Sequence, residues 1–172
     1  MHLALLPAFR FRQVDRLTSQ PAPSAFAASV PAPADPVAAA RRREAVLRGD
    51  EPLRILLPSY RSDPHTGGQG IYMDYMSRAI LELGHQVEVI SGPPYPRLDP
   101  RITLTKLESL DLYAKPKNWM GIPSYPKGAS KTWTDIQEYL THISGGFGEL
   151  KSFGERLYKH MRGRAHLYDV VH

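Results

Sequence analysis

The chain has 172 residues, a hydrophobic fraction of 42%, a formal net charge of +5 and no cysteine. Disulfides, thiolate catalysis and cysteine-based zinc sites are therefore excluded, and the lack of cysteine favours a cytoplasmic compartment. The length allows one domain of ordinary size, and no run approaches the ~18 consecutive apolar residues that a membrane-spanning helix needs.

Residues 1–50 form an N-terminal segment whose middle part, residues 20–40, is rich in alanine and proline. This part has no periodic hydrophobic pattern and buries too little apolar surface to offset the entropy lost on ordering. We therefore predict a disordered tail. Within the segment, residues 41–48 are good helix formers and predict a short helix. The folded domain is expected at residues 51–172.

The first part of this domain predicts a βαβ unit around a glycine-rich turn. Residues 54–58 are predicted as a buried strand, 69–83 as an amphipathic helix and 86–91 as a second strand. Gly84 is expected to end the helix in the left-handed conformation. The helix face expected to meet the core consists of Tyr72, Met76, Ala79, Ile80 and Leu83.

The second part alternates helices and strands less regularly. Residues 102–107 predict a weak strand, 108–130 a loop broken by proline and glycine, and 168–172 a final strand. Two helices are predicted between them, at 131–143 and 149–162. Their core-facing residues are expected to be Trp133, Ile136, Leu140 and Ile143 in the first, and Leu150, Phe153, Leu157 and Met161 in the second. Strands alternating with helices predict an α/β fold, a Rossmann-like parallel sheet with helices on both faces.

The turn at residues 67–70, Gly-Gly-Gln-Gly, allows three interpretations. A dinucleotide site would need G-x-G-x-x-G and an acidic residue at the end of the second strand, and neither is present. A P-loop would need a Gly-Lys-Ser/Thr sequence, which is also missing. A tight turn without ligand remains open. Because free N–H groups at a helix N-terminus can meet an anion, the functional alternative is a phosphate-bearing ligand.

Four segments, in this order, resemble the N-terminal domain of family 4 glycosyltransferases, the retaining GT-B group. They are residues 54–60, the glycine turn, residues 81–91 (LELGHQVEVIS) and residues 168–172 (YDVVH). The resemblance covers about residues 52–172, half of such an enzyme. It implies that this domain holds the acceptor, while a C-terminal domain missing from the chain binds a nucleotide-sugar donor. The chain would then be a fragment that is inactive by itself.

The resemblance also implies the site residues. Gly67, Gly68 and Gln69 would approach the donor phosphates or the acceptor, and His172 would contact ligand at the carboxyl end of the last strand. Arg61, Asp63 and His65 share the loop before the glycines and are further candidates to line the cleft. No catalytic residue is assigned. Enzymes of this group generally need no metal, so no metal or other cofactor is expected.

The basic residues of the chain bear on two classes of partner, membranes and nucleic acids. The basic helix that begins near Lys151 is predicted to be a solvated face, with peripheral contact to an anionic membrane as the alternative. No nucleic-acid partner is predicted, because basic and aromatic residues are not interleaved. A different class of function also remains open, namely a non-catalytic α/β module that binds a phosphorylated ligand or a protein partner.

Overall fold

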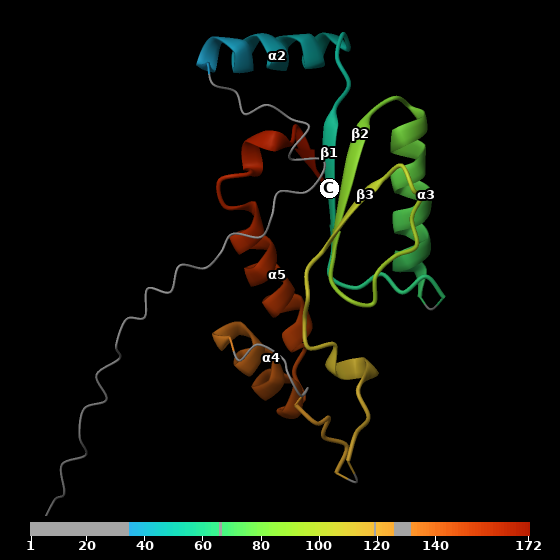
Figure 1. Ribbon diagram of the computed structural model, residues 1–172, viewed down its shortest axis with the longest axis vertical. Coiled ribbons are helices and arrows are strands. Elements are labelled where there is room, and N and C mark those ends of the chain that lie inside the picture. The colour runs from blue at the N-terminus through green and yellow to red at the C-terminus, as the bar shows by residue number, and fades with distance from the viewer. Residues whose placement is uncertain (1–34, 66, 119, 126–131) are drawn as a thin grey trace, which may run out of the picture.

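The computed structural model describes residues 35–65, 67–118, 120–125 and 132–172 (Figure 1). Most of the predicted tail therefore lies outside the described residues. Its last part forms helix α2, Pro36–Arg48, which confirms the predicted helix at 41–48. The helix begins five residues earlier than predicted, so the prediction of disorder is wrong for residues 36–40. The Asp35 side chain accepts a hydrogen bond from the Val37 N–H at 2.9 Å, and Gly49 ends the helix at φ +81°.

A four-stranded parallel sheet forms the centre of the domain and confirms the predicted α/β fold. Its spatial order is β3-β2-β1-β4, so the chain starts in the middle and adds strands outward on both sides. The strands are β1 Arg54–Ser59, β2 Gln86–Ser91, β3 Thr103–Lys106 and β4 Val170–Val171. The last strand is shorter than predicted and pairs only with Ile55 and Leu56 of β1.

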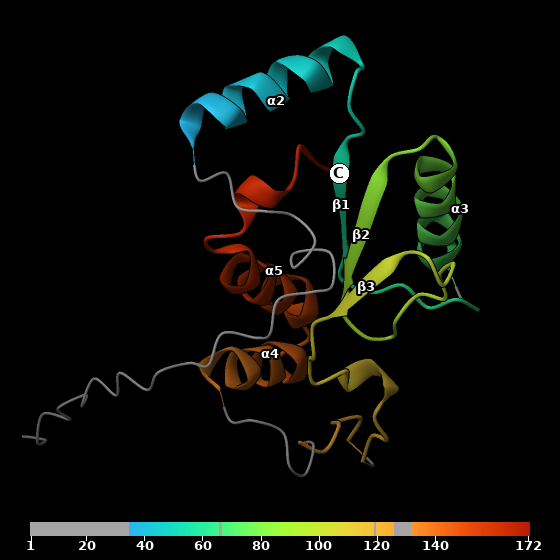
Figure 2. The same cartoon turned by 45° about the horizontal axis from the view of Figure 1, so that its top comes forward.

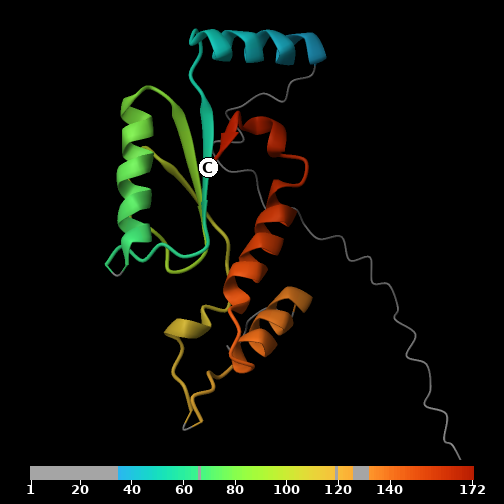
Figure 3. The ribbon, with the colours of Figure 1, turned by 180° about the vertical axis from the view of Figure 1, so that it is seen from behind.

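Helices cover both faces of the sheet, as predicted (Figure 3). Helix α3, Gly68–Glu82, packs on the face that carries Ile55, Leu57, Val87 and Val89. Helix α5, Gly148–Met161, lies on the opposite face, where Leu157 and Met161 pack against a cluster formed by Leu56, Ile90, Leu167 and Tyr168. Gly84 adopts φ +85° after α3, which confirms the predicted left-handed end.

The predicted buried face of α3 is partly wrong. Met76 and Ile80 pack on the core as expected, whereas Tyr72 and Leu83 are 44% and 74% exposed and Ala79 is exposed as well. Met73, which the sequence pattern did not single out, is buried instead. The helix is thus rotated toward Met73, because Gly70 on the same side packs directly on the backbone of the preceding loop.

Below the carboxyl ends of the strands, the chain forms a short 3₁₀ turn, η1 Leu112–Ala114, and helix α4, Trp133–Ile143 (Figure 2). Helix α4 packs along α5. A second 3₁₀ turn, η2 Ala165–Leu167, leads into β4. Within the described ranges, no helix is both long and apolar enough to cross a membrane.

The face of α4 that is buried is opposite to the predicted one. Trp133, Leu140 and Ile143 are exposed by 69%, 52% and 42%, whereas Thr134, Asp135 and Glu138 are buried against α5. On α5, Phe153 is buried as predicted, but Leu150 is 59% exposed. The predictions for Trp133, Leu140, Ile143 and Leu150 are therefore wrong.

An arginine explains this arrangement. Arg156 of α5 donates to Glu138 at 2.7 Å and to Asp135 at 2.5 Å, with all three side chains at least 86% buried. Lys159 of α5 also donates to Thr134 of α4, at 3.1 Å. Charged partners on α5 therefore draw the polar face of α4 inward, because carboxylates without a partner would not be buried.

We expect Arg156→Leu to destabilise the protein by about 3–5 kcal/mol at neutral pH, because it leaves two buried carboxylates without their cation. Urea unfolding measures the change. The matched control is Lys151→Leu, which removes an exposed cation of the same helix that makes no ion pair with α4 among the described residues. Equal losses in the two variants would show that the Arg156 ion pairs do not hold α4 on α5.

A second ionic contact fixes the edge of the sheet. Asp169 accepts hydrogen bonds from the Arg54 backbone N–H at 2.8 Å, from the Arg54 guanidinium at 3.2 Å and from Arg42 of α2 at 2.8 Å. Burial by itself would raise the pKa of Asp169, but the hydrogen bonds and charge of Arg54, together with the hydrogen bond from Arg42, hold it below its ordinary value.

We expect Asp169→Asn to cost about 1–3 kcal/mol of unfolding free energy at pH 7. The folded-state pKa is lowered, so the contribution of this carboxylate is fully present above its unfolded pKa of about 3.9 and is lost as the pH falls through the folded-state value. Urea unfolding at a series of pH values should therefore show wild type and variant converging in acid. A constant difference would contradict this assignment. Asp50→Asn, which removes an exposed partner of Arg48, is the control.

Candidate functional site

The carboxyl ends of β1, β2 and β3 lie at one edge of the sheet, where ligands bind in open α/β sheets. The connection from β1 to α3, residues 60–67, runs along this edge. It is fixed at its start, because the buried hydroxyls of Ser59 and Ser62 hydrogen-bond to each other and the Ser62 N–H donates to the Pro94 carbonyl at 2.9 Å. The loop that carries the glycines is thus tied to the segment after β2.

The three glycines at this edge have different structural roles. Gly67 precedes α3 with φ +81°, a conformation that other residues rarely adopt. A Cβ on Gly70 would lie 2.0 Å from the Asp63 carbonyl oxygen, so only glycine fits there. A Cβ on Gly68 would have no neighbouring atom within 4 Å. Gly70 is therefore needed for packing, and Gly67 is needed for the left-handed backbone conformation before α3. Gly68 is needed for neither, and the space beside it at the surface is open.

Among the described residues, no side chain caps the N-terminus of α3, whose N-cap residue is Gly67, and α5 also lacks a side-chain cap. Helices α2 and α4, in contrast, are capped by Asp35 and Thr132, and α4 has a complete capping box. Gly67, Gly68 and Gln69 are all exposed, so the first N–H groups of α3 face solvent. Such groups carry partial positive charge and can donate to an anion.

His172 lies away from the carboxyl end of β1. Its backbone N–H donates to the Leu56 carbonyl at 3.0 Å, so it sits level with the middle of β1. Its Nε2 atom is 2.8 Å from the hydroxyl of Tyr72, on the second turn of α3. His172 therefore contacts Tyr72 of α3, the helix that begins at the glycine turn. The sequence pattern had predicted that Tyr72 faces the core.

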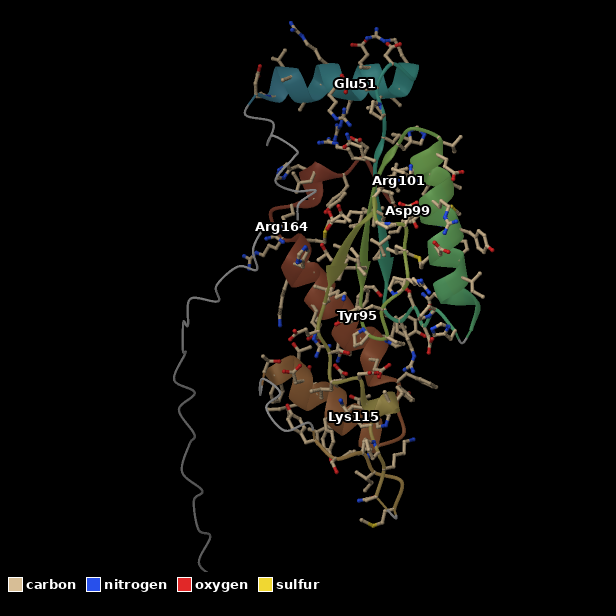
Figure 4. The ribbon with its side chains drawn as sticks, turned by 45° about the vertical axis from the view of Figure 1, so that its right-hand side comes forward. Glu51, Tyr95, Asp99, Arg101, Lys115 and Arg164 are labelled. Carbon is tan, nitrogen blue, oxygen red and sulfur yellow. The ribbon has the colours of Figure 1, made fainter. Side chains whose placement is uncertain are left out.

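A surface hollow of about 490 Å³ opens beside the loop, between α3 and the β2–β3 connection. Figure 4 shows Asp99 and Arg101 on this connection beside α3. Most charges here are neutralised: Arg101 donates to Asp99 at 2.8 Å and lowers the pKa of Asp99, and Arg78 donates to Asp74 at 2.9 Å. Arg97, also in the lining, is exposed and has no hydrogen-bond partner among the described residues.

No group of three or more His, Asp or Glu side chains in the described part of the chain is placed to hold a metal ion. The expectation that no metal or cofactor is needed stays a prediction.

The sequence is similar to part of a known enzyme. It is 50% identical, over 121 residues, to the MMP alpha-(1->4)-mannosyltransferase of Mycolicibacterium hassiacum. The matched region is 70% of this chain but 29% of that relative, so the chain spans less than a third of the relative's length. No protein-family model matches the sequence. A homologue of the chain is thus a glycosyltransferase.

We expect Gly68→Ala to leave stability unchanged or to raise it by up to about 1 kcal/mol, since alanine is the better helix former and has room. Gly70→Ala should cost about 1–3 kcal/mol, because its Cβ would overlap the Asp63 carbonyl. Thermal unfolding of the two variants compares them directly. Similar melting temperatures would contradict the different roles given to the two glycines.

Proposed function

We propose that the chain forms the acceptor-side domain of a family 4 glycosyltransferase with a GT-B fold, which uses a nucleotide sugar and retains the anomeric configuration. The observation that carries this proposal is the 50% identity over 121 residues to a mannosyltransferase. We accordingly propose mannose as the transferred sugar and a sugar 4-hydroxyl as the acceptor group. The donor-binding domain would be a second domain outside this chain.

The exposed N-terminus of α3 supports a role in stabilising the leaving group. In the proposed reaction, the bond between the anomeric carbon and the phosphate oxygen breaks, and the acceptor oxygen bonds to the anomeric carbon on the same face of the sugar. The proton of the acceptor hydroxyl passes to the leaving diphosphate. Negative charge develops on that diphosphate in the transition state. The free N–H groups next to Gly67 and Gly68 and the dipole of α3 would stabilise that charge.

Glycine at 67 and 68 would let the diphosphate approach the backbone closely, and Gln69 could donate from its amide. His172 could take part through its contact with Tyr72. We assign no catalytic residue and no metal to this domain, since helix N–H groups supply charge stabilisation without one. A cytoplasmic location, with peripheral contact to an anionic membrane as the alternative, belongs to the same proposal.

A chimera tests the proposal. The 121 matched residues of the mannosyltransferase from Mycolicibacterium hassiacum would be replaced by those of this chain, and mannosyl transfer from a nucleotide donor would be measured. The expected result is transfer with retention, seen by NMR of the product. A folded chimera that binds pyrophosphate but transfers no sugar would overturn the proposal and favour a non-catalytic phosphate-binding module.

In the active chimera, we expect Gly68→Val to lower turnover by about 10²-fold or more, because its side chain would occupy the space next to the free N–H groups. The fold should be retained, since nothing lies within 4 Å of a Cβ at Gly68. Gly154→Val is the matched control, because Gly154 is also a helical glycine with open space around it. Unchanged turnover in Gly68→Val would refute the role given to the glycine turn.

A further inference from the structure

Arg61 is held in place by two residues from distant parts of the chain. It lies in the loop after β1, and its Nη1 atom is 3.4 Å from a carboxylate oxygen of Glu149, in the first turn of α5. Its guanidinium carbon lies 5.3 Å from the ring centre of Tyr113 in η1. Tyr113 packs edge-on against His142 of α4, with ring centres 4.7 Å apart. Four elements therefore meet around this arginine below the sheet.

The position of Arg61 leaves hydrogen-bonding capacity unused. A guanidinium has five N–H donors, and the contact with Glu149 is the only side-chain hydrogen bond of Arg61 within the described residues. A third of the side chain is exposed, whereas Glu149 is nine-tenths buried. Because the carboxylate and the ring already restrict the guanidinium, a ligand that binds it would lose little additional side-chain entropy.

The surrounding charges indicate which ligand fits. Burial raises the pKa of Glu149, and although Arg61 opposes this rise, the charges of Glu138 and Asp111 add to it. Within the part of the chain that the structure describes, one oxygen of Glu149 and one of Asp111 are buried without a hydrogen-bond partner. The carboxylate of Glu149 offsets the charge of the single guanidinium, so the cluster carries no excess positive charge that would attract a phosphate. Neutral hydroxyl groups avoid that repulsion.

We propose that Arg61 binds hydroxyl groups of a neutral saccharide, the acceptor, with Tyr113 as the adjoining aromatic surface and Glu149 as the positioning residue. This inference rests on the proposed function, since it takes the acceptor to be a sugar. Arg61 would determine acceptor specificity, because its donors and the Tyr113 ring recognise a hydroxyl-bearing ring rather than an anion.

The test measures binding to the 172-residue chain by isothermal titration calorimetry. The probes are α-(1→4)-mannobiose, which is neutral, and inorganic pyrophosphate. We expect Arg61→Gln to weaken mannobiose binding about tenfold or more, and Arg61→Lys to weaken it as well, because lysine loses the planar fork. Arg162→Gln, at the opposite end of α5, should bind as the wild type does. Melting temperatures of all variants are compared, so that lost binding is not confused with unfolding.

The role of Glu149 is tested by a double-mutant cycle. Glu149→Gln should weaken mannobiose binding in the wild type but have no further effect in Arg61→Gln, because it acts only through the arginine. An equal additional loss in both backgrounds would refute the positioning role.

Three results would overturn the saccharide site. They are no mannobiose binding by the wild-type chain (with or without Arg61-dependent pyrophosphate binding), equal mannobiose affinity in Arg61→Gln and wild type, and loss of mannobiose binding in Arg97→Gln but not in Arg61→Gln. The last result would place the sugar in the hollow beside α3. None of these measurements requires sugar transfer. An inactive chimera together with Arg61-dependent mannobiose binding would refute the proposed function and retain this site.

Discussion

The sheet depends on one buried carboxylate, that of Glu88 in the middle of β2. Its side chain is fully buried, and it accepts hydrogen bonds from the Thr105 hydroxyl of β3 at 2.5 Å and from the Tyr168 hydroxyl at 2.8 Å. Burial and this bond to Glu88 both raise the pKa of Tyr168. A carboxylate without such partners would cost several kcal/mol to bury. Glu88 therefore connects β2 to β3 and to the segment that leads into β4.

The elements that local sequence determines could be predicted. The strands at 54–59 and 86–91 and the left-handed Gly84 follow from hydrophobic runs and from the conformational freedom of glycine. The orientation of α4 could not be predicted, because its pattern of Trp133, Leu140 and Ile143 indicates an apolar inner face. The orientation is determined by the ion pairs of Arg156, on α5, with Glu138 and Asp135 of α4. The local sequence of α4 does not predict these ion pairs.

The candidate site was also predicted only in part from the sequence. The glycine turn was visible in the sequence, since glycines before an amphipathic helix are a local signal. Gly70 is needed for packing because the Asp63 carbonyl lies directly against it in the folded protein. The sequence does not reveal this contact. The cluster around Arg61 draws on residues up to 88 positions apart. Its one sequence signal is the position of Arg61 just after a strand, which does not reveal Tyr113 or Glu149.

The attachment of α2 has a consequence for how the protein responds to its solvent. No side chain of this helix is fully buried, and Arg42 connects it to the domain through Glu51, Asp169 and the Pro52 carbonyl. Arg42 is 26% exposed, so dissolved salt can screen its ion pairs, whereas the sheet is held by burial that salt does not weaken. Added salt should therefore weaken the attachment of α2 before it weakens the sheet.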